Sequence, residues 1–415
     1  MFPGWMCLGG TEIINNERAA AYAATRGLIL ECDRCPELTE FLEHDPYQDP
    51  ATDDAPWHDR TVAASEEFFG LLGGEITGMS EATFTRSPTP LTGDGSSIGP
   101  ARRTHREITV TAAFLAASES GLSYGIGWLA RALSGSGCGS SCAGMDMTVL
   151  AACPSDSPDP DAEIRYLYDV GISEGPTVTA REWVDGVLWG TVTFTLIVGK
   201  PGVFGPALGG LGQWRFLTDG RSEKADPDQV YEECLPTLPC ATDPTCPPPI
   251  LPPSPPVPVS PCYTKGVAAF RVARLQVIEE EYPAWTTLVP LIEVQSGAGT
   301  LRRLLIRFWA NPANLPCEDG LDPCDACGDI NVPFIPANAR LTIDARTRRS
   351  MIECADQDGL ISTTYPSLMG PRGGAFSYPE FPCPGGLCVE VWALTDGMGV
   401  GASARVSLVP RMDAI

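Results

Sequence analysis

The stretch "TAREWVDGVLWGTVTFTLIVG", residues 179–199, decides the fold class. Two arms that alternate apolar and polar residues flank a two-residue connection, Asp185-Gly186. This dipeptide suits the tight turn between antiparallel strands, and the alternation gives each strand one apolar face. The stretch therefore predicts a β-hairpin within an antiparallel sheet.

Upstream segments extend the same sheet. Residues 90–118, "PLTGDGSSIGPARRTHREITVTAAFLAAS", join a glycine-rich loop to an alternating run over 107–114. A phosphate-binding loop is the alternative, but the lysine and the following helix that such a loop uses are lacking. We interpret the loop as structural, feeding a strand. A further strand is predicted over 164–172.

Two helices interrupt the strands. Residues 11–27 are rich in alanine and predict a short helix with Asn15 or Asn16 as its cap and Gly27 at its end. Residues 120–133 place leucine and isoleucine at helical spacing, which predicts a helix packed on a sheet face.

The second half contains seven short apolar segments from residue 266 to the end, which favours a two-layer β-sandwich of the galectin or jelly-roll kind. The prediction is thus a mainly β protein with a few helices, divided as follows: an N-terminal helix and extended arm (1–73), a ring-forming β domain with one packed helix (74–233), a proline- and cysteine-rich linker (234–265) and the sandwich (266–415).

Composition excludes several classes of function. A net charge of −24 and a pI near 4.4 oppose contact with nucleic acid, which requires clustered basic residues. The sequence shows neither a secretory signal nor an apolar run of membrane-spanning length. The 16 cysteines nevertheless suit a protein that ends in oxidising surroundings, as a virion made in a bacterium and then released would.

No motif predicts catalysis, and we assign no catalytic residue, metal or cofactor. "GISEG" around Ser173 has the form of a hydrolase nucleophile turn, but no helix follows and every histidine lies upstream, so Gly171 and Gly175 are interpreted as turn residues. The acidic run 156–163 could hold calcium or be a solvated turn, and the turn is favoured. We do not expect an enzyme.

The cysteines form local groups, for which disulfides, zinc binding and free thiols remain open. A zinc site would use the loop 317–327 with Cys354, whereas local disulfides are the favoured reading. The disulfide candidates are Cys32, Cys35, Cys138, Cys142, Cys153, Cys234, Cys240, Cys246, Cys262, Cys317, Cys324, Cys327, Cys383 and Cys388.

Arginines stand out in this acidic chain. They are either surface charges paired with local acids or contacts between subunits, where arginine is enriched. The strongest candidates for an oligomer interface are Arg102, Arg103 and Arg106. The further arginines of this set are Arg302, Arg303, Arg346, Arg348 and Arg349.

The order of several motifs resembles the minor tail proteins of long-tailed bacteriophages (siphoviruses) that infect actinobacteria, and more broadly phage distal tail proteins. The motifs are "PGWMCLGGTEIINNERAAAYA" (3–23), "TGMSEATFTRSP" (77–88), "GSSIGPARRTHREITVTAAFLAASESGLSYGIGWLARAL" (95–133), "LAACP" (150–154), "RRLLIRFWANP" (302–312), "CDAC" (324–327), "VPFIPANARLTIDARTRRS" (332–350) and "VEVWALTDGMGVGASARVSLVPR" (389–411).

This resemblance implies a structural virion protein, assembled in the host cytoplasm, that forms a ring, by likeness a hexamer, at the distal end of the tail tube. Its partners would be further copies of itself, the tail tube protein, other tip or baseplate proteins and a host envelope glycan. The insertion at 32–60 and the proline-rich linker depart from compact distal tail proteins. The alternative function is a carbohydrate-binding or adhesive sandwich that contacts the host surface.

Overall fold

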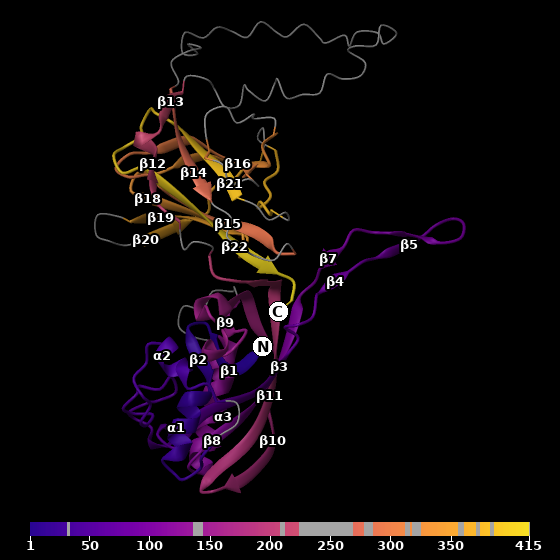
Figure 1. Cartoon of the computed structure of the whole chain (residues 1–415), viewed down its shortest axis with the longest axis vertical. Helices are drawn as coiled ribbons and strands as arrows, with labels where there is room; N and C mark the ends of the chain where they lie inside the picture. The colour runs from indigo at the N-terminus through magenta and orange to yellow at the C-terminus, as the bar shows by residue number, and fades with distance from the viewer. Residues whose placement is uncertain are drawn as a thin grey trace, which may run out of the picture. The chain divides into compact units, whose positions relative to one another are not determined.

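The computed structural model describes residues 1–30, 34–135, 144–207, 212–223, 269–277, 285–311, 316–317, 325–355, 361–370, 374–381 and 386–414. Contacts divide the chain into two compact units (Figure 1). One comprises Met1–Pro206 together with Pro410–Ile415, and the other comprises Ala207–Val409. The chain therefore builds the first unit, then the second, and ends by returning to the first. The predicted linker at 234–265 lies outside the described residues.

The first unit holds most of the helices of the described chain. Its elements in order are β1 (Phe2–Leu8), β2 (Thr11–Asn15), α1 (Asn16–Ala24), α2 (Glu37–Phe41), η1 (Ala63–Ser65), β3 (Phe68–Thr77), β4 (Phe84–Thr85), β5 (Pro88–Pro90), β6 (Ser96–Ile98), β7 (Arg102–Arg103), β8 (Arg106–Ala116), α3 (Glu119–Ser134), β9 (Met145–Leu150), η2 (Pro154–Asp156), η3 (Pro160–Glu163), β10 (Ile164–Val184) and β11 (Val187–Phe204).

The predicted hairpin is confirmed as β10 and β11, which pair antiparallel from Tyr166 with Phe204 to Val184 with Val187. Asp185 and Gly186 have φ of 44° and 81°, the left-handed values that the tight turn requires. β8 pairs with β11 on one side and β3 on the other, and β9, β1 and β2 continue from the first part of β10.

The core of the first unit lies between this sheet and its helices. Ile108, Val110 and Phe114 of β8 are fully buried, as the alternation predicted. The predicted second helix is confirmed as α3. Ser118 caps its start by accepting a hydrogen bond from the Gly121 N–H. Because apolar side chains recur along one side of α3, that side packs into the same core.

The structure corrects two local predictions. Residues 11–15 form strand β2 rather than the start of a helix, and α1 begins only after Asn15, whose side chain accepts from the Arg18 N–H at 3.0 Å. The "GISEG" glycines were interpreted as turn residues, but they lie inside β10. β2 pairs with its neighbour β1, and the GISEG stretch lies in the part of β10 that pairs with β11. Strand pairing therefore overrides the helix and turn signals at these two places.

The expected boundary after residue 73 falls inside β3. Residues before and after it share one hydrophobic core, to which Ile14 and Tyr22 contribute alongside Phe114 and Val192. The N-terminal segment is therefore an integral part of the first unit rather than an arm laid over it.

The second unit is a sandwich of two antiparallel sheets, which confirms the mainly β prediction. Its elements are β12 (Arg215–Phe216), η4 (Leu217–Asp219), β13 (Arg221–Glu223), β14 (Phe270–Val277), β15 (Thr287–Gln295), β16 (Leu301–Asn311), β17 (Gly328–Ile335), β18 (Ala339–Asp344), β19 (Arg349–Ala355), β20 (Ile361–Thr364), β21 (Gly386–Leu394) and β22 (Ser403–Met412), whose last residues belong to the first unit.

One sheet has the order β13-β14-β21-β16-β17, and the other runs from β22 through β15, β18 and β19 to β20. Side chains such as Ile306, Val391 and Ile343 fill the space between them. β17 was not expected from the sequence. Conversely, residues 373–381 are one of the seven apolar segments expected to be strands, and their described part contributes only a single bridge, from Phe381 to Leu288.

A row of alternating charges crosses the first of these sheets. Arg274, Glu390, Arg307 and Asp329 stand directly opposite one another on β14, β21, β16 and β17. The Arg274 Nε donates to Glu390 at 2.7 Å, and Arg307 donates two hydrogen bonds to Asp329, at 2.9 and 3.0 Å. Both side chains of the Arg307–Asp329 pair are 1% exposed. A one-residue slip of any strand would bury an unpaired charge, so the row fixes strand register.

We predict that Asp329→Ala lowers the free energy of unfolding by about 3–5 kcal/mol, because it leaves the Arg307 guanidinium buried without its carboxylate. The double replacement Arg307→Met with Asp329→Leu should cost clearly less. Asp396→Ala, which removes the exposed partner of Arg302, is the control and should change it by under about 1 kcal/mol. Urea denaturation measures all three, and equal effects of Asp329→Ala and the control would refute the assignment.

Candidate functional site

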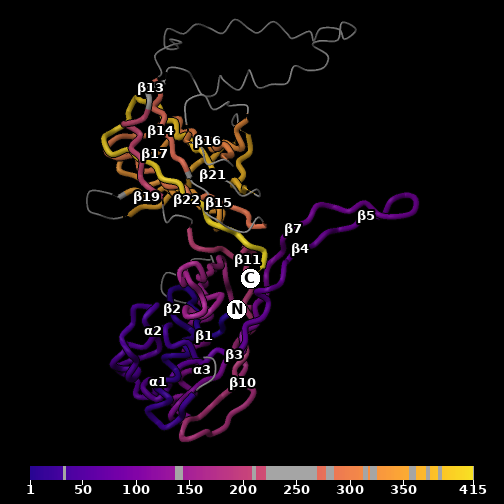
Figure 2. The backbone as a smooth tube through the Cα atoms, viewed as in Figure 1, coloured from indigo at the N-terminus to yellow at the C-terminus, as the bar shows by residue number. Residues whose placement is uncertain are grey.

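A hairpin formed by residues 80–105 projects from the first unit between the end of β3 and the start of β8 (Figure 1). The backbone trace follows it out and back (Figure 2). We call it the exposed hairpin, because all its residues are exposed except Thr83 and Gly99, which are half-buried. Its strands pair as β4 with β7 and β5 with β6.

The exposed hairpin carries apolar side chains that its own chain leaves uncovered. Phe84, Leu91 and Ile98 are 46%, 54% and 69% exposed. A two-stranded hairpin without a hydrophobic core is marginally stable in water, and apolar side chains gathered on an exposed element mark an interaction surface. This segment therefore has the properties of a contact element.

Arg106, at the start of β8, fixes the base of the exposed hairpin. Its side chain is 1% exposed, and its guanidinium donates five hydrogen bonds to backbone carbonyls. The acceptors are Gly78 at 2.6 Å, Met79 at 3.1 Å, Glu81 at 2.8 Å, Pro201 at 3.1 Å and Asp413 at 2.6 Å.

These contacts correct the expectation that Arg106 faces another subunit. The side chain joins the segment before the hairpin, β11 and the C-terminal residues within one chain. Burial lowers the pKa of Arg106, and the nearby carboxylates of Asp413 and Glu81 oppose that effect. The sequence could not distinguish Arg106 from its exposed neighbours. Its hydrogen-bond acceptors are backbone carbonyls, which every residue type has.

Arg102 and Arg103 lie on β7, in the exposed hairpin. Arg103 donates two hydrogen bonds to the carboxylate of Asp413, at 2.7 and 3.3 Å, and its guanidinium lies 5.1 Å from the ring centre of Phe84. Arg102 is exposed. Of the three predicted interface arginines, it is the one whose side chain is most available to another molecule.

Other arginines of the predicted set pair with acids or aromatic rings of their own unit. Arg346 donates to Asp344, Arg348 to Glu380, and the guanidinium of Arg303 lies 5.3 Å from the ring centre of Phe270. These contacts favour the reading of local surface charges over that of an interface.

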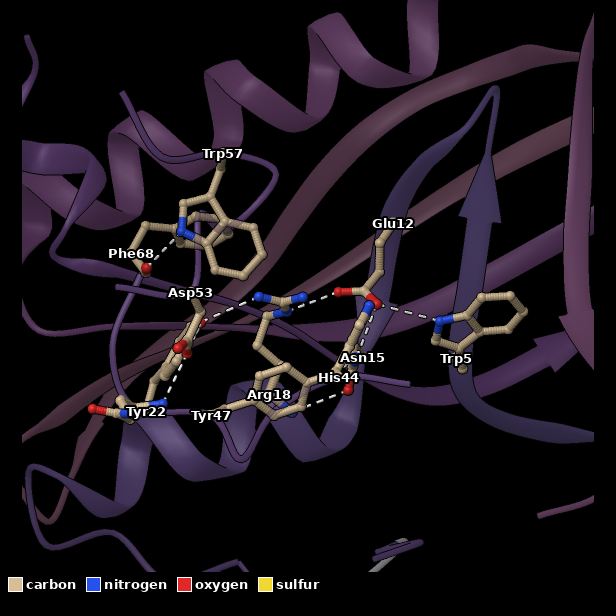
Figure 3. A network of polar contacts seen from close by, with 11 residues as sticks. Trp5, Glu12, Asn15, Arg18, Tyr22, His44, Tyr47, Asp53, Trp57 and Phe68 are labelled. Carbon is tan, nitrogen blue, oxygen red and sulfur yellow. Dashed lines mark hydrogen bonds and ion pairs between the residues drawn. The ribbon is translucent and has the colours of Figure 1, made fainter. Parts of the chain in front are cut away.

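A buried polar network attaches residues 34–62 to the first unit (Figure 3). Arg18 of α1 is central to it. Its Nε donates to Glu12 at 2.9 Å, and its guanidinium also donates to the Tyr22 hydroxyl at 3.3 Å. That hydroxyl donates to Asp53 at 2.8 Å, and the Asn15 amide donates to the Tyr47 hydroxyl at 2.9 Å.

The same segment also reaches the hydrophobic core. Trp57 is 4% exposed, and its Nε1 donates to the Phe68 carbonyl at 2.9 Å. Glu17 accepts from the backbone N–H of Cys35 at 2.7 Å. A hollow of about 780 Å³ is lined by Glu12, Arg18, Tyr47 and Asp53 among others. Because these side chains bond one another, we interpret the hollow as part of a structural anchor.

The described cysteines form two disulfides that cross between the sequence groups. Cys35 bonds Cys153, 118 residues away, and Cys317 bonds Cys388, 71 residues away. The favoured expectation of local disulfides is wrong for these pairs, because sheet pairing brings distant segments together. Cys7, Cys327 and Cys354 are free thiols. The other candidates, Cys32, Cys138, Cys142, Cys234, Cys240, Cys246, Cys262, Cys324 and Cys383, lie outside the described residues.

The alternatives that involve metals receive no support from the part of the chain that the structure describes. Cys317 cannot serve as a zinc ligand while it is bonded to Cys388. Within that part, the one cluster of ligand-type side chains is Cys35, Glu37 and Cys153, and its two cysteines form a disulfide. The carboxylates of the acidic run 156–163 are not gathered around a common point.

Comparison with known proteins does not establish a family for this chain. No protein-family model and no curated protein matches the chain. Among solved structures, the chain is similar to the Dit protein of phage SPP1, described as a paradigm of the hub of the adsorption apparatus in phages that infect Gram-positive hosts. The similarity covers 84% of this chain and 95% of Dit, at 10% identity and a TM-score of 0.36.

A weaker similarity relates the chain to the insecticidal delta-endotoxin Cry8Ea1 of Bacillus thuringiensis. It covers 83% of this chain and 53% of the toxin, at 8% identity and a TM-score of 0.17. TM-scores this low do not establish a shared fold. Separately, none of the helices described in the structure has the length and apolar composition needed to cross a bilayer.

We predict that Arg106→Gln lowers the free energy of unfolding by about 3 kcal/mol or more, since each buried carbonyl left without a donor costs about 1–3 kcal/mol. Hydrogen exchange should also accelerate across residues 410–414. Arg102→Gln on the exposed strand is the matched control and should stay within about 0.5 kcal/mol. If the two variants unfold at the same urea concentration, Arg106 does not fix the base.

The network also predicts a loss of stability at alkaline pH. Burial, together with the nearby Glu12 carboxylate, raises the pKa of Tyr47 from 10.0 to about 12. The folded state therefore holds a proton that the unfolded state has lost between these two values, so stability falls as pH rises through this range. Tyr47→Phe should flatten that fall in urea titrations from pH 9 to 12, while the same change at the exposed Tyr365 should not. An unchanged slope in Tyr47→Phe would contradict the prediction.

Proposed function

We propose that this chain is a structural component of a phage tail, which forms a ring at the distal end of the tail tube and joins the tube to the tip and host-adhesion apparatus. It performs no catalysis. The observation that carries the proposal is the exposed hairpin, an element without a core that presents Phe84, Leu91 and Ile98 to a partner. The resemblance in the order of the sequence motifs supports the same assignment.

The sheet of the first unit presents one face to its surroundings. Its face opposite the core is rich in threonine: Thr77, Thr109 and Thr195 stand in one row and Thr111 and Thr193 in the next. Apart from the exposed Thr77, these residues are half-buried, and the Thr109 and Thr195 hydroxyls lie 3.4 Å apart. Glu75 and Glu107 are exposed on the same face, so this part of the sheet is polar and acidic.

Among the described residues, the same sheet also has an edge strand that is unpaired on one side. The second part of β10, residues 172–184, pairs with β11 and with no other strand among the described residues. Edge strands present backbone donors and acceptors that another chain can pair with. The hairpin and this edge are different surfaces of one unit, so a contact between them or near them is heterologous, and heterologous contacts close rings when the rotation fits.

In this proposal the partners are further copies of this chain, six by the resemblance, the tail tube protein and other tip or baseplate proteins. The acidic body, with its net charge of −24, keeps single subunits soluble before assembly. Contact of the second unit with a host envelope glycan belongs to the same proposal. The bridges Cys35–Cys153 and Cys317–Cys388 suit a particle that leaves the cell.

The purified chain, alone and mixed with tail tube protein, tests the proposal. Negative-stain microscopy and light scattering should show rings. Arg102→Glu, which reverses the charge of the most available hairpin arginine, should shift the population toward single subunits with unchanged melting temperature. Arg60→Glu, an exposed charge reversal in the segment 34–62, is the control and should assemble normally. Single particles under both conditions, combined with glycan-dependent thermal stabilisation, would instead support the free adhesive protein.

A further inference from the structure

The first unit contains an apolar groove on the sheet from which the exposed hairpin emerges. The groove has a volume of about 610 Å³. Its floor includes Leu72 and the small residues Gly73, Gly74 and Ala113, and Trp189 and the 75% exposed Ile29 stand beside them. Because several of its lining residues are small, the groove leaves room for large side chains from outside. We call it the apolar groove.

We propose that the apolar groove of one copy receives the exposed hairpin of a second copy, with Leu91 and Ile98 seated between Ile29 and Trp189. This inference rests on the proposed ring function and names the surface that the hairpin meets. It makes the subunit contact heterologous, hairpin into groove, so that each copy offers both halves and the contact repeats around an axis.

Charge identifies the occupant as a second copy. The hairpin contains three arginines (Arg86, Arg102 and Arg103) against Glu81 and Asp94, which leaves it at +1, whereas the rest of the chain carries −25. A basic element on an acidic body is attracted to the body of a neighbouring copy, and such complementarity guides association. Glu75, exposed on β3 and paired with Thr111, places a carboxylate beside the groove.

The hairpin's own base directs it away from its own groove. Arg106 holds the carbonyls of Gly78, Met79 and Glu81, and Arg103 bonds Asp413, so both strands are fixed where they leave the sheet. The hairpin then extends away from the sheet (Figure 2). Since the fixed base opposes folding back, the groove of a neighbour is the accessible one.

Side chains rather than backbone make the proposed contact. Pro88 and Pro90 of β5 have no N–H to give to an added strand, and prolines on exposed strands oppose edge-to-edge pairing. Recognition therefore depends on Leu91 and Ile98 fitting a cavity of defined size. That makes the inference testable by changing the cavity without changing the hairpin.

The groove is blocked by Thr191→Trp, which places an indole over its floor, and the control Thr195→Trp puts the same side chain on the same strand and face but outside the groove. The double variant Leu91→Ser with Ile98→Ser removes the apolar side chains, and Thr89→Ser is its control. Thr191→Trp and the double serine variant should each raise the concentration for half-assembly about tenfold or more, measured by light scattering. The controls should assemble as the unmodified chain does.

Photo-cross-linking locates the contact directly. The chain carrying benzoylphenylalanine in place of Ile98 is made with ¹⁴N and with ¹⁵N, and the two are mixed and irradiated. Cross-linked peptides of mixed label that contain residue 29, 30 or 189 would support the inference. Adducts of single label alone would mean that the hairpin contacts its own chain, and adducts elsewhere would place the seam on another surface. Either overturns the inference.

The two proposals fail differently. Rings that persist in Thr191→Trp overturn the hairpin-in-groove contact and leave the ring function standing. An unmodified chain that remains single, with and without tail tube protein, overturns both. Circular dichroism melting of each variant shows that loss of assembly is not loss of folding, because exposed and half-buried positions carry little of the core.

Discussion

The arrangement of the first unit depends on a single buried guanidinium. Arg106 gathers carbonyls from the segment before the exposed hairpin, from β11 and from the C-terminal residues, the last of which lie 307 positions from Arg106 in the chain. A buried charge without acceptors would be prohibitively costly, so these three segments must be present together for the unit to be stable. The position of the C-terminal residues, where the chain comes back to the first unit, is thus energetically coupled to the direction in which the exposed hairpin leaves the sheet.

That coupling has a consequence for assembly. A hairpin without a core cannot fix its own direction, and its flexible joint would normally lose entropy on binding. Here Arg106 and the Arg103–Asp413 pair fix the first residues of both strands inside one chain. Much of the hairpin's conformational entropy is therefore already lost on folding. Contact with a neighbouring copy has to order only the outer part of the exposed hairpin.

Local patterns in the sequence were enough to predict the elements whose partners are neighbours. Asp185-Gly186 defined the β10–β11 hairpin, and the spacing of Leu122, Leu129 and Leu133 defined α3, because turn geometry and helical periodicity are short-range properties. The division into many short strands indicated a mainly β protein in the same way.

Long-range pairing is where sequence reasoning failed. β1 contains Gly4, neither β1 nor β2 alternates clearly, and β1 is held in the sheet by pairing with the distant β9. Cys35–Cys153 and Cys317–Cys388 could not be paired from spacing, since sheet topology determines which cysteines meet. The sequence alone could not distinguish Arg102 from Arg106, although Arg102 is exposed and Arg106 is buried among carbonyls.

Two buried arginines, Arg307 in the second unit and Arg106 in the first, are stabilised in different ways, and the difference relates to the role of each. The second unit pairs Arg307 side chain to side chain, within the row from Arg274 to Asp329, which specifies strand register. The first unit satisfies Arg106 with backbone from three places, which constrains position more than register. Hydrogen bonds to backbone carbonyls suit a unit that must present a hairpin in one direction, because they hold the main chain itself. They also leave the hairpin's side chains available for contacts outside the chain.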